Sequence, residues 1–145
     1  MIRPIQSHDK DFYLTAAEAF YQSDAVLNPV PKKHLEMTFQ QLLDGSPYAY
    51  GYIFEQNGSP AGYALLAKTW SQEAGGFVIW IEEIYLLPEA RGKGLGHEFF
   101  SFLEKAFPDA VRFRLEVELE NEGAVRLYQN LGFEFFPYQQ MKKGN

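Results

Sequence analysis

The chain has 145 residues, 46% of them hydrophobic and 17% aromatic, and carries a formal net charge of −6. This composition argues against disorder and is enough for one globular domain over residues 1–145 with a substantial core. The acidic balance disfavours a nucleic-acid partner, and the absence of cysteine excludes disulfides, thiolate catalysis and a cysteine-based zinc site. No run approaches about 18 apolar residues, and the N-terminus lacks the apolar stretch of a secretion signal. We therefore expect a cytoplasmic protein with no membrane partner.

The first half of the chain predicts a strand, two helices and a hairpin. A short strand is expected over 2–5, and a helix capped by Asp9 is expected to carry apolar residues at helical spacing up to Phe20. A second helix is predicted to start near Pro31 or Lys32 and to run through Leu43. The pair Asn57-Gly58 is typical of a type I′ turn and lies between two apolar runs, which predicts a β-hairpin.

The second half predicts a central strand followed by alternating helices and strands. The strand covers 77–87 and ends at Pro88, and from Leu95 apolar residues recur at helical spacing until Pro108. The remaining predicted elements are a strand over 111–117, a helix over 121–131 and two closing strands over 133–136 and 139–143. The fold class predicted is α/β, with a mixed, mostly antiparallel sheet of about six to seven strands and four helices.

A glycine-rich turn follows the central strand and is the most informative motif. Glycines remove the Cβ atoms that keep an anion from the main chain, and the following helix offers unpaired N–H groups. The spacing fits neither a P-loop nor a dinucleotide fingerprint, and the alternative is a turn without a ligand. The predicted phosphate cradle consists of Arg91, Gly92, Lys93, Gly94, Leu95 and Gly96.

Two adjacent carboxylates, Glu82 and Glu83, interrupt the apolar central strand. Strand periodicity places them on opposite faces, and a carboxylate inside a sheet is unfavourable unless it is paired or used. Desolvation would raise its pKa toward the range of a general base. The alternative is that one glutamate pairs with a basic residue and the other is solvated.

Asn121 and Tyr128 are predicted to share one face of the last helix, because seven residues make nearly two turns. A tyrosine hydroxyl stays protonated at neutral pH and can donate a proton to a leaving group that departs as an anion. The alternative for Tyr128 is a core aromatic whose hydroxyl bonds to the main chain.

The pattern R-x-x-G-x-G at Arg91, together with the segment from Asn121 to Phe133, resembles the GNAT superfamily of acetyl-CoA-dependent N-acetyltransferases. The resemblance implies a GNAT-like acyl-CoA N-acyltransferase fold with acetyl-CoA as co-substrate. It implies that the glycine turn binds the pyrophosphate. The residues implied to meet the pantetheine arm are Ile84, Tyr85, Leu86 and Asn121.

The same resemblance implies catalytic roles. Tyr128 matches the general acid, Glu82 matches an acid used by some amine acetyltransferases, and Glu116 matches a base of ribosomal-protein acetyltransferases. We rank Glu82 above Glu116 as the base. Direct attack in a ternary complex is expected, since no cysteine can form an acyl-enzyme.

The expected partner is a small-molecule or peptide amine, and Asp24 with the acidic total favours a cationic one. Alternatives are acetylation of a protein N-terminus or lysine, or a non-catalytic sensor of acyl-CoA. The histidines lack metal-ligand spacing, so no metal site is expected. Aromatic residues such as Trp70 and Phe136 are expected in the core or at a subunit contact, which leaves a homodimer open.

Overall fold

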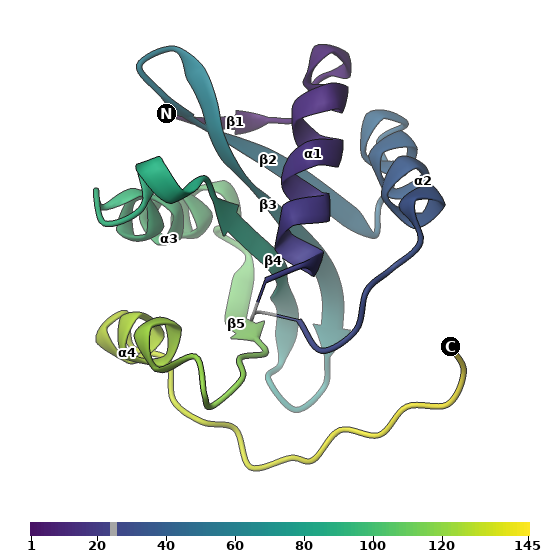
Figure 1. The fold of residues 1–145 in the computed structure, drawn as a ribbon. Helices are drawn as coiled ribbons and strands as arrows, with labels where there is room; N and C mark the ends of the chain where they lie inside the picture. The colour runs from purple at the N-terminus through teal and green to yellow at the C-terminus, as the bar shows by residue number, and fades with distance from the viewer. Residues whose placement is uncertain (24–25) are drawn as a thin grey trace.

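In the computed structural model, which describes residues 1–23 and 26–145, one five-stranded sheet organises the described chain (Figure 1). The strands lie side by side in chain order, and only the last pair, β4 with β5, is parallel. The mixed, mostly antiparallel sheet that the sequence predicts is therefore confirmed. The strands are β1 (Ile2–Pro4), β2 (Ala49–Gln56), β3 (Ser59–Ser71), β4 (Gly76–Leu86) and β5 (Ala110–Leu115).

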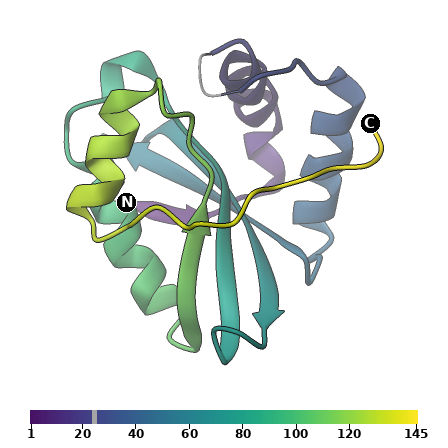
Figure 2. The same cartoon turned by 90° about the horizontal axis from the view of Figure 1, so that it is seen from below.

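In the part of the chain that the structure describes, four helices cover the two faces of the sheet. Figure 2 shows α1 and α2 on one side and α3 and α4 on the other. Each face has its own apolar core: Tyr13 of α1 and Phe39 of α2 belong to one, and Phe99 and Leu103 of α3 belong to the other. Within the described residues, no helix combines the length and the apolarity needed to cross a membrane. The helices are α1 (Lys10–Tyr21), α2 (Lys32–Leu43), α3 (Leu95–Ala106) and α4 (Glu122–Asn130).

Local sequence chemistry explains the tight turns. Asn57 and Gly58 have φ values of 54° and 77°, as the predicted type I′ hairpin between β2 and β3 requires. Gly62 allows β3 to approach β4, because a Cβ at this position would lie 2.3 Å from the main-chain oxygen of Tyr85. The hairpin prediction is thus confirmed, and Gly62 fixes where the second half of β4 lies.

The N-terminus is held by a buried ion pair rather than by the helix cap that the sequence predicts at Asp9. The Asp9 side chain makes no cap bond to α1; it accepts bonds of 2.8 and 2.9 Å from the Arg3 guanidinium and one of 2.8 Å from the Gln6 amide. Burial alone would raise the pKa of Asp9, but the bonds from Arg3 and Gln6 together keep that pKa below its ordinary value. Arg3 also pairs with Glu55, which links β1 to β2.

The two closing strands predicted over 133–136 and 139–143 are wrong, because the described chain after α4 pairs with no strand. Figure 2 shows this segment crossing the ends of the strands toward α2. Side chains hold it instead of ladder bonds: Phe136 stacks on Arg112 and Arg114, and Tyr138 donates to Glu73. The sheet within the described residues therefore has five strands rather than six or seven.

Candidate active site

The parting of β4 and β5 creates the candidate site. The two strands pair in parallel from Phe77 and Ala110 up to Ile81 and Leu115. Beyond this point β4 continues to Leu86 with no described strand on that side, and its other edge stays paired to β3. Within the described residues, one edge of the second half of β4 therefore has no ladder partner, and the Leu86 oxygen there accepts a bond from the Arg91 side chain.

A cavity of about 750 Å³ opens at this parting. Its walls come from the end of α1 with residues 26–28, from the second half of β4, from residues 115–118 after β5, and from α4. The sequence-predicted residues that line it are Glu82, Ile84, Tyr85, Leu86, Arg91, Glu116, Asn121 and Tyr128. Residues separated by more than forty positions in the chain are thus brought to one cavity. Asp24 lies outside the described residues.

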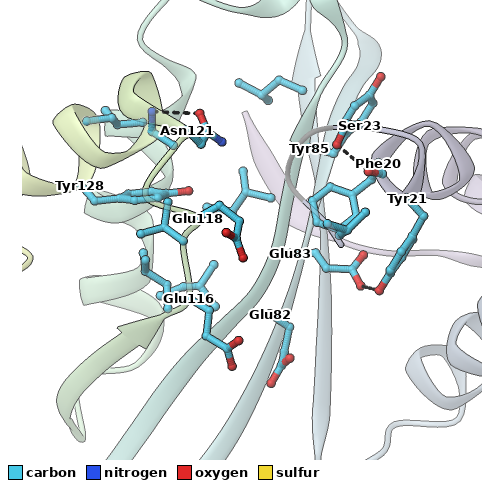
Figure 3. A pocket seen from close by; sticks show the side chains of 18 of the residues that line it. Phe20, Tyr21, Ser23, Glu82, Glu83, Tyr85, Glu116, Glu118, Asn121 and Tyr128 are labelled. Carbon is cyan, nitrogen blue, oxygen red and sulfur yellow. Dashed lines mark hydrogen bonds between the residues drawn. The ribbon is translucent and has the colours of Figure 1, made fainter. Parts of the chain in front are cut away.

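Tyr128 is anchored by its ring and points its hydroxyl into the cavity (Figure 3). The ring packs against Phe100 and Phe133 at centroid distances of 6.1 and 6.0 Å. Within the described chain the hydroxyl has no hydrogen-bond partner, so the alternative of a main-chain bond does not hold. Burial raises the pKa of Tyr128, and the phenol therefore keeps its proton at neutral pH.

Asn121 lies at the start of the helix that carries Tyr128, α4. Its Oδ1 accepts a bond of 3.4 Å from the Ala124 amide, which is an N-cap arrangement. Both Asn121 and Tyr128 line the cavity, so the predicted shared face of α4 is confirmed.

Glu82 occupies an irregularity in β4 that sequence periodicity does not reveal. In the ladder with β3, Leu66 pairs with Ile81 and Leu65 pairs with Glu83, so Glu82 is left without a partner. Such a bulge re-aims the side chains on either side of it. The Glu82 side chain is exposed and lies beside Glu116 at the cavity (Figure 3). Partial withdrawal from water, and then the charges of Glu116 and Glu83, raise the pKa of Glu82.

Glu83 is the buried member of the pair, with 9% of its surface exposed. It lies on the opposite face of β4 from Glu82, as strand periodicity predicts. It has no basic partner within the described residues; instead, the hydroxyls of Tyr21 and Tyr63 donate to its two carboxylate oxygens. Burial raises the pKa of Glu83, and the two hydrogen bonds only partly offset this. No sequence motif links Tyr21 and Tyr63 to Glu83, because the three residues lie on separate elements, α1, β3 and β4.

The glycine turn lies between the 3₁₀ turn Pro88–Ala90 and α3. Gly92 and Gly94 have φ values of 72° and 83°, and added Cβ atoms there would meet nothing within 4 Å. The Leu95 side chain is buried, and a Cβ added at Gly96 would lie 3.4 Å from the Leu127 side chain of α4. The turn thus exposes main chain at the start of a helix, with free N–H groups ahead of the first α3 bond.

Arg91 links this turn to β4. Its Nε donates a bond of 3.1 Å to the Leu86 oxygen, and its guanidinium lies 5.6 Å from the ring centroid of Tyr85. Of the predicted cradle, only Arg91 lines the cavity itself; Gly92, Lys93, Gly94, Leu95 and Gly96 lie outside it. Lys93 is exposed.

Comparison with known proteins identifies the family. A family model described as the acetyltransferase (GNAT) family matches residues 11–133. The chain belongs to the GNAT family. An uncharacterized N-acetyltransferase of Methanocaldococcus jannaschii is 29% identical over 139 residues, 92% of this chain and 60% of that protein. A thialysine N-epsilon-acetyltransferase of Sus scrofa is 36% identical over 72 residues, 48% of this chain and 40% of that protein.

The matched stretches of this GNAT chain thus span less than two thirds of either relative. The solved structure of the aminoglycoside N-acetyltransferase AAC(6')-Iy, in complex with a CoA bisubstrate analogue, matches with a TM-score of 0.81 at 15% identity. The match covers 100% of this chain and 97% of that one, and it confirms the GNAT fold that the sequence resemblance implied.

Proposed function

We propose that this GNAT protein transfers the acetyl group of acetyl-CoA to a primary amine of a small cationic molecule, by direct attack in a ternary complex. The observation that carries the proposal is the open edge of β4 between Ile81 and Leu86, facing the Tyr128 hydroxyl across the cavity. An extended amide-bearing chain can add to such an edge as a further strand does.

The residues around this edge fit coenzyme A. The main chain of Ile84, Tyr85 and Leu86 would bind the pantetheine arm, and Asn121 would contact it from α4. The exposed backbone from Gly92 to Gly96 would bind the pyrophosphate through free N–H groups at the positive end of the α3 dipole. Bound there, acetyl-CoA supplies a thioester whose carbonyl carbon an amine can attack.

Glu82 is the proposed base. An amine is mostly protonated at neutral pH and cannot attack until a proton is removed. The raised pKa of Glu82 strengthens it as a proton acceptor, and its side chain reaches the cavity from the bulge of β4. Glu116 lies beside it and is the second candidate, with the additional effect of raising the pKa of Glu82.

Tyr128 is the proposed acid, and β4 supplies the oxyanion donor. As the amine nitrogen bonds to the carbonyl carbon, a main-chain N–H near Leu86 donates to the developing oxyanion. Cleavage of the carbon–sulfur bond leaves a thiolate, which takes the Tyr128 proton. The unpartnered hydroxyl and the raised pKa of Tyr128 support this assignment, because the proton is present and is not engaged elsewhere.

The acceptor is proposed to be cationic because of the charges around the cavity. Four carboxylates line it, those of Glu82, Glu83, Glu116 and Glu118, and Arg91 is the single basic residue within the described lining. The similar proteins named for thialysine and for aminoglycosides are N-acetyltransferases of small-molecule amines as well.

Release of free thiol from acetyl-CoA across a panel of small amines tests the proposal. We expect amine-dependent release that falls about 100-fold in Glu82→Gln and much less in Glu116→Gln. A protein that binds coenzyme A but releases no thiol with any amine would instead be a sensor. Release only with peptide amines would redirect the proposal to a protein acceptor.

A further inference from the structure

The mechanism proposed above leaves one buried charged group without a role. Glu83 is 9% exposed and lies on the α1 side of β4, opposite to Glu82. Its two oxygens accept hydroxyl bonds, from Tyr63 at 2.7 Å and from Tyr21 at the end of α1. An uncharged side chain of similar size would avoid the desolvation of a carboxylate in a sheet. We therefore looked for a functional role of the Glu83 carboxylate at the cavity.

The two tyrosines differ in what they reach. Tyr63 is 0% exposed and holds the carboxylate from inside the core, where it also packs against Tyr13. Tyr21 lines the cavity, as does Glu83. Tyr63 thus fixes the carboxylate, and the carboxylate in turn fixes the Tyr21 hydroxyl at the cavity wall (Figure 3).

This arrangement sets the direction of hydrogen bonding at the wall. A phenol that donates its only proton to a carboxylate retains lone pairs as acceptors, and the bond to the anion makes its oxygen a stronger acceptor. Tyr21 therefore offers an acceptor, not a donor, to a molecule in the cavity. The C-terminal end of α1 adds the negative end of its dipole at the same place.

Tyr21 and Tyr128 reach the cavity from opposite sides, from α1 and from α4 (Figure 3). A nitrogen near Tyr128 and Glu82 is in position to react, whereas a group at Tyr21 is held away from the leaving sulfur. A molecule that contacts Tyr21 as well as the reacting side needs a second group there. Because Tyr21 offers an acceptor at the negative end of α1, this second group should donate hydrogen bonds and be positively charged.

We propose that Tyr21, positioned by Glu83 and Tyr63, binds a second, non-reacting ammonium group of the acceptor. The acceptor is thus a diamine or a related dication, and this inference rests on the proposed acetyl transfer. Tyr21 contacts the substrate, while Glu83 and Tyr63 are positioning residues that keep its hydroxyl proton turned inward.

The test compares diaminopentane with pentylamine, which differ by one terminal amine. Thiol release gives kcat and KM for each, and calorimetry on protein saturated with coenzyme A gives both dissociation constants. We expect the wild-type protein to prefer the diamine. In Tyr21→Phe the ratio of kcat/KM for diamine to that for monoamine should fall about tenfold, mainly through KM, as for a lost hydrogen bond to a charged group.

Tyr52→Phe is the matched control, because Tyr52 packs against Phe102 on the other face of the sheet and does not line the cavity. It should keep the wild-type ratio. Glu83→Gln should also lower the ratio, and it replaces Tyr21→Phe if thermal unfolding shows that variant to be misfolded. An unchanged ratio in folded Tyr21→Phe or Glu83→Gln, or a wild-type protein that does not prefer the diamine, would overturn the inference. If no amine releases thiol, the proposed function fails, and the calorimetric preference still decides whether the second ammonium is bound.

Discussion

Removing the Tyr128 hydroxyl separates a chemical role from a structural one. In Tyr128→Phe the ring keeps its contacts with Phe100 and Phe133, and within the described chain the lost hydroxyl has no hydrogen-bond partner. The free energy of unfolding should therefore change by no more than about 0.5 kcal/mol. If the phenol protonates the leaving thiolate, kcat should fall by about 100-fold or more, which corresponds to about 2.7 kcal/mol of activation free energy.

The assay is steady-state thiol release at saturating acetyl-CoA and amine, with urea unfolding of the same preparation. The raised pKa of Tyr128 adds a second expectation. The wild-type rate should not decline from loss of the phenolic proton below about pH 10, the ordinary pKa of tyrosine. Tyr50→Phe, on β2 against Phe107, is the control and should keep both rate and stability. An unchanged kcat in folded Tyr128→Phe would refute the assignment of the acid.

The other predictions concern the base, the shape of β4 and the N-terminal ion pair. The proposed base, Glu82, must be deprotonated to act, and its pKa is raised. The wild-type rate should therefore rise with pH through a limb above the ordinary glutamate pKa of about 4.3. Glu82→Gln should abolish that limb in a pH–rate profile. Gly62→Ala would place a methyl group 2.3 Å from the Tyr85 oxygen, so β4 must shift, and calorimetry should show weaker binding of coenzyme A. Arg3→Met leaves the buried carboxylate of Asp9 with its Gln6 amide bond but without its arginine partner, and urea unfolding should show that the free energy of unfolding falls by about 3 kcal/mol. Because the pKa of Asp9 is lowered in the folded state, its contribution to the free energy of unfolding is present above about pH 4 and is lost as the pH falls further. Acid should therefore destabilise the wild-type protein more steeply than Arg3→Met. Equal slopes of the free energy of unfolding against pH would contradict this role of Asp9.

The sequence was sufficient where the chemistry is local. The glycine turn before α3, the hairpin at Asn57-Gly58 and the seven-residue spacing of Asn121 and Tyr128 each depend on neighbouring residues, and the structure has all three. The apolar run over β4 likewise predicted a central strand with its two adjacent glutamates on opposite faces.

Long-range features could not be predicted in this way. The bulge at Glu82 exists only in the pairing of β4 with β3, and no residue type marks it. Tyr21 and Glu83 are 62 positions apart, so nothing in either segment indicates their hydrogen bond. The two strands predicted after α4 also fail for this reason, because the local sequence does not indicate whether a ladder partner is present.

The open edge of β4 is the central claim, and hydrogen–deuterium exchange with and without acetyl-CoA tests it most directly. The account predicts that acetyl-CoA slows exchange in two segments, the main chain of Ile84 to Leu86 and the turn from Gly92 to the first residues of α3. No described strand pairs with this edge beyond Ile81, so the change at Ile84 to Leu86 should be large. Binding of acetyl-CoA with no added protection in these two segments would contradict the account.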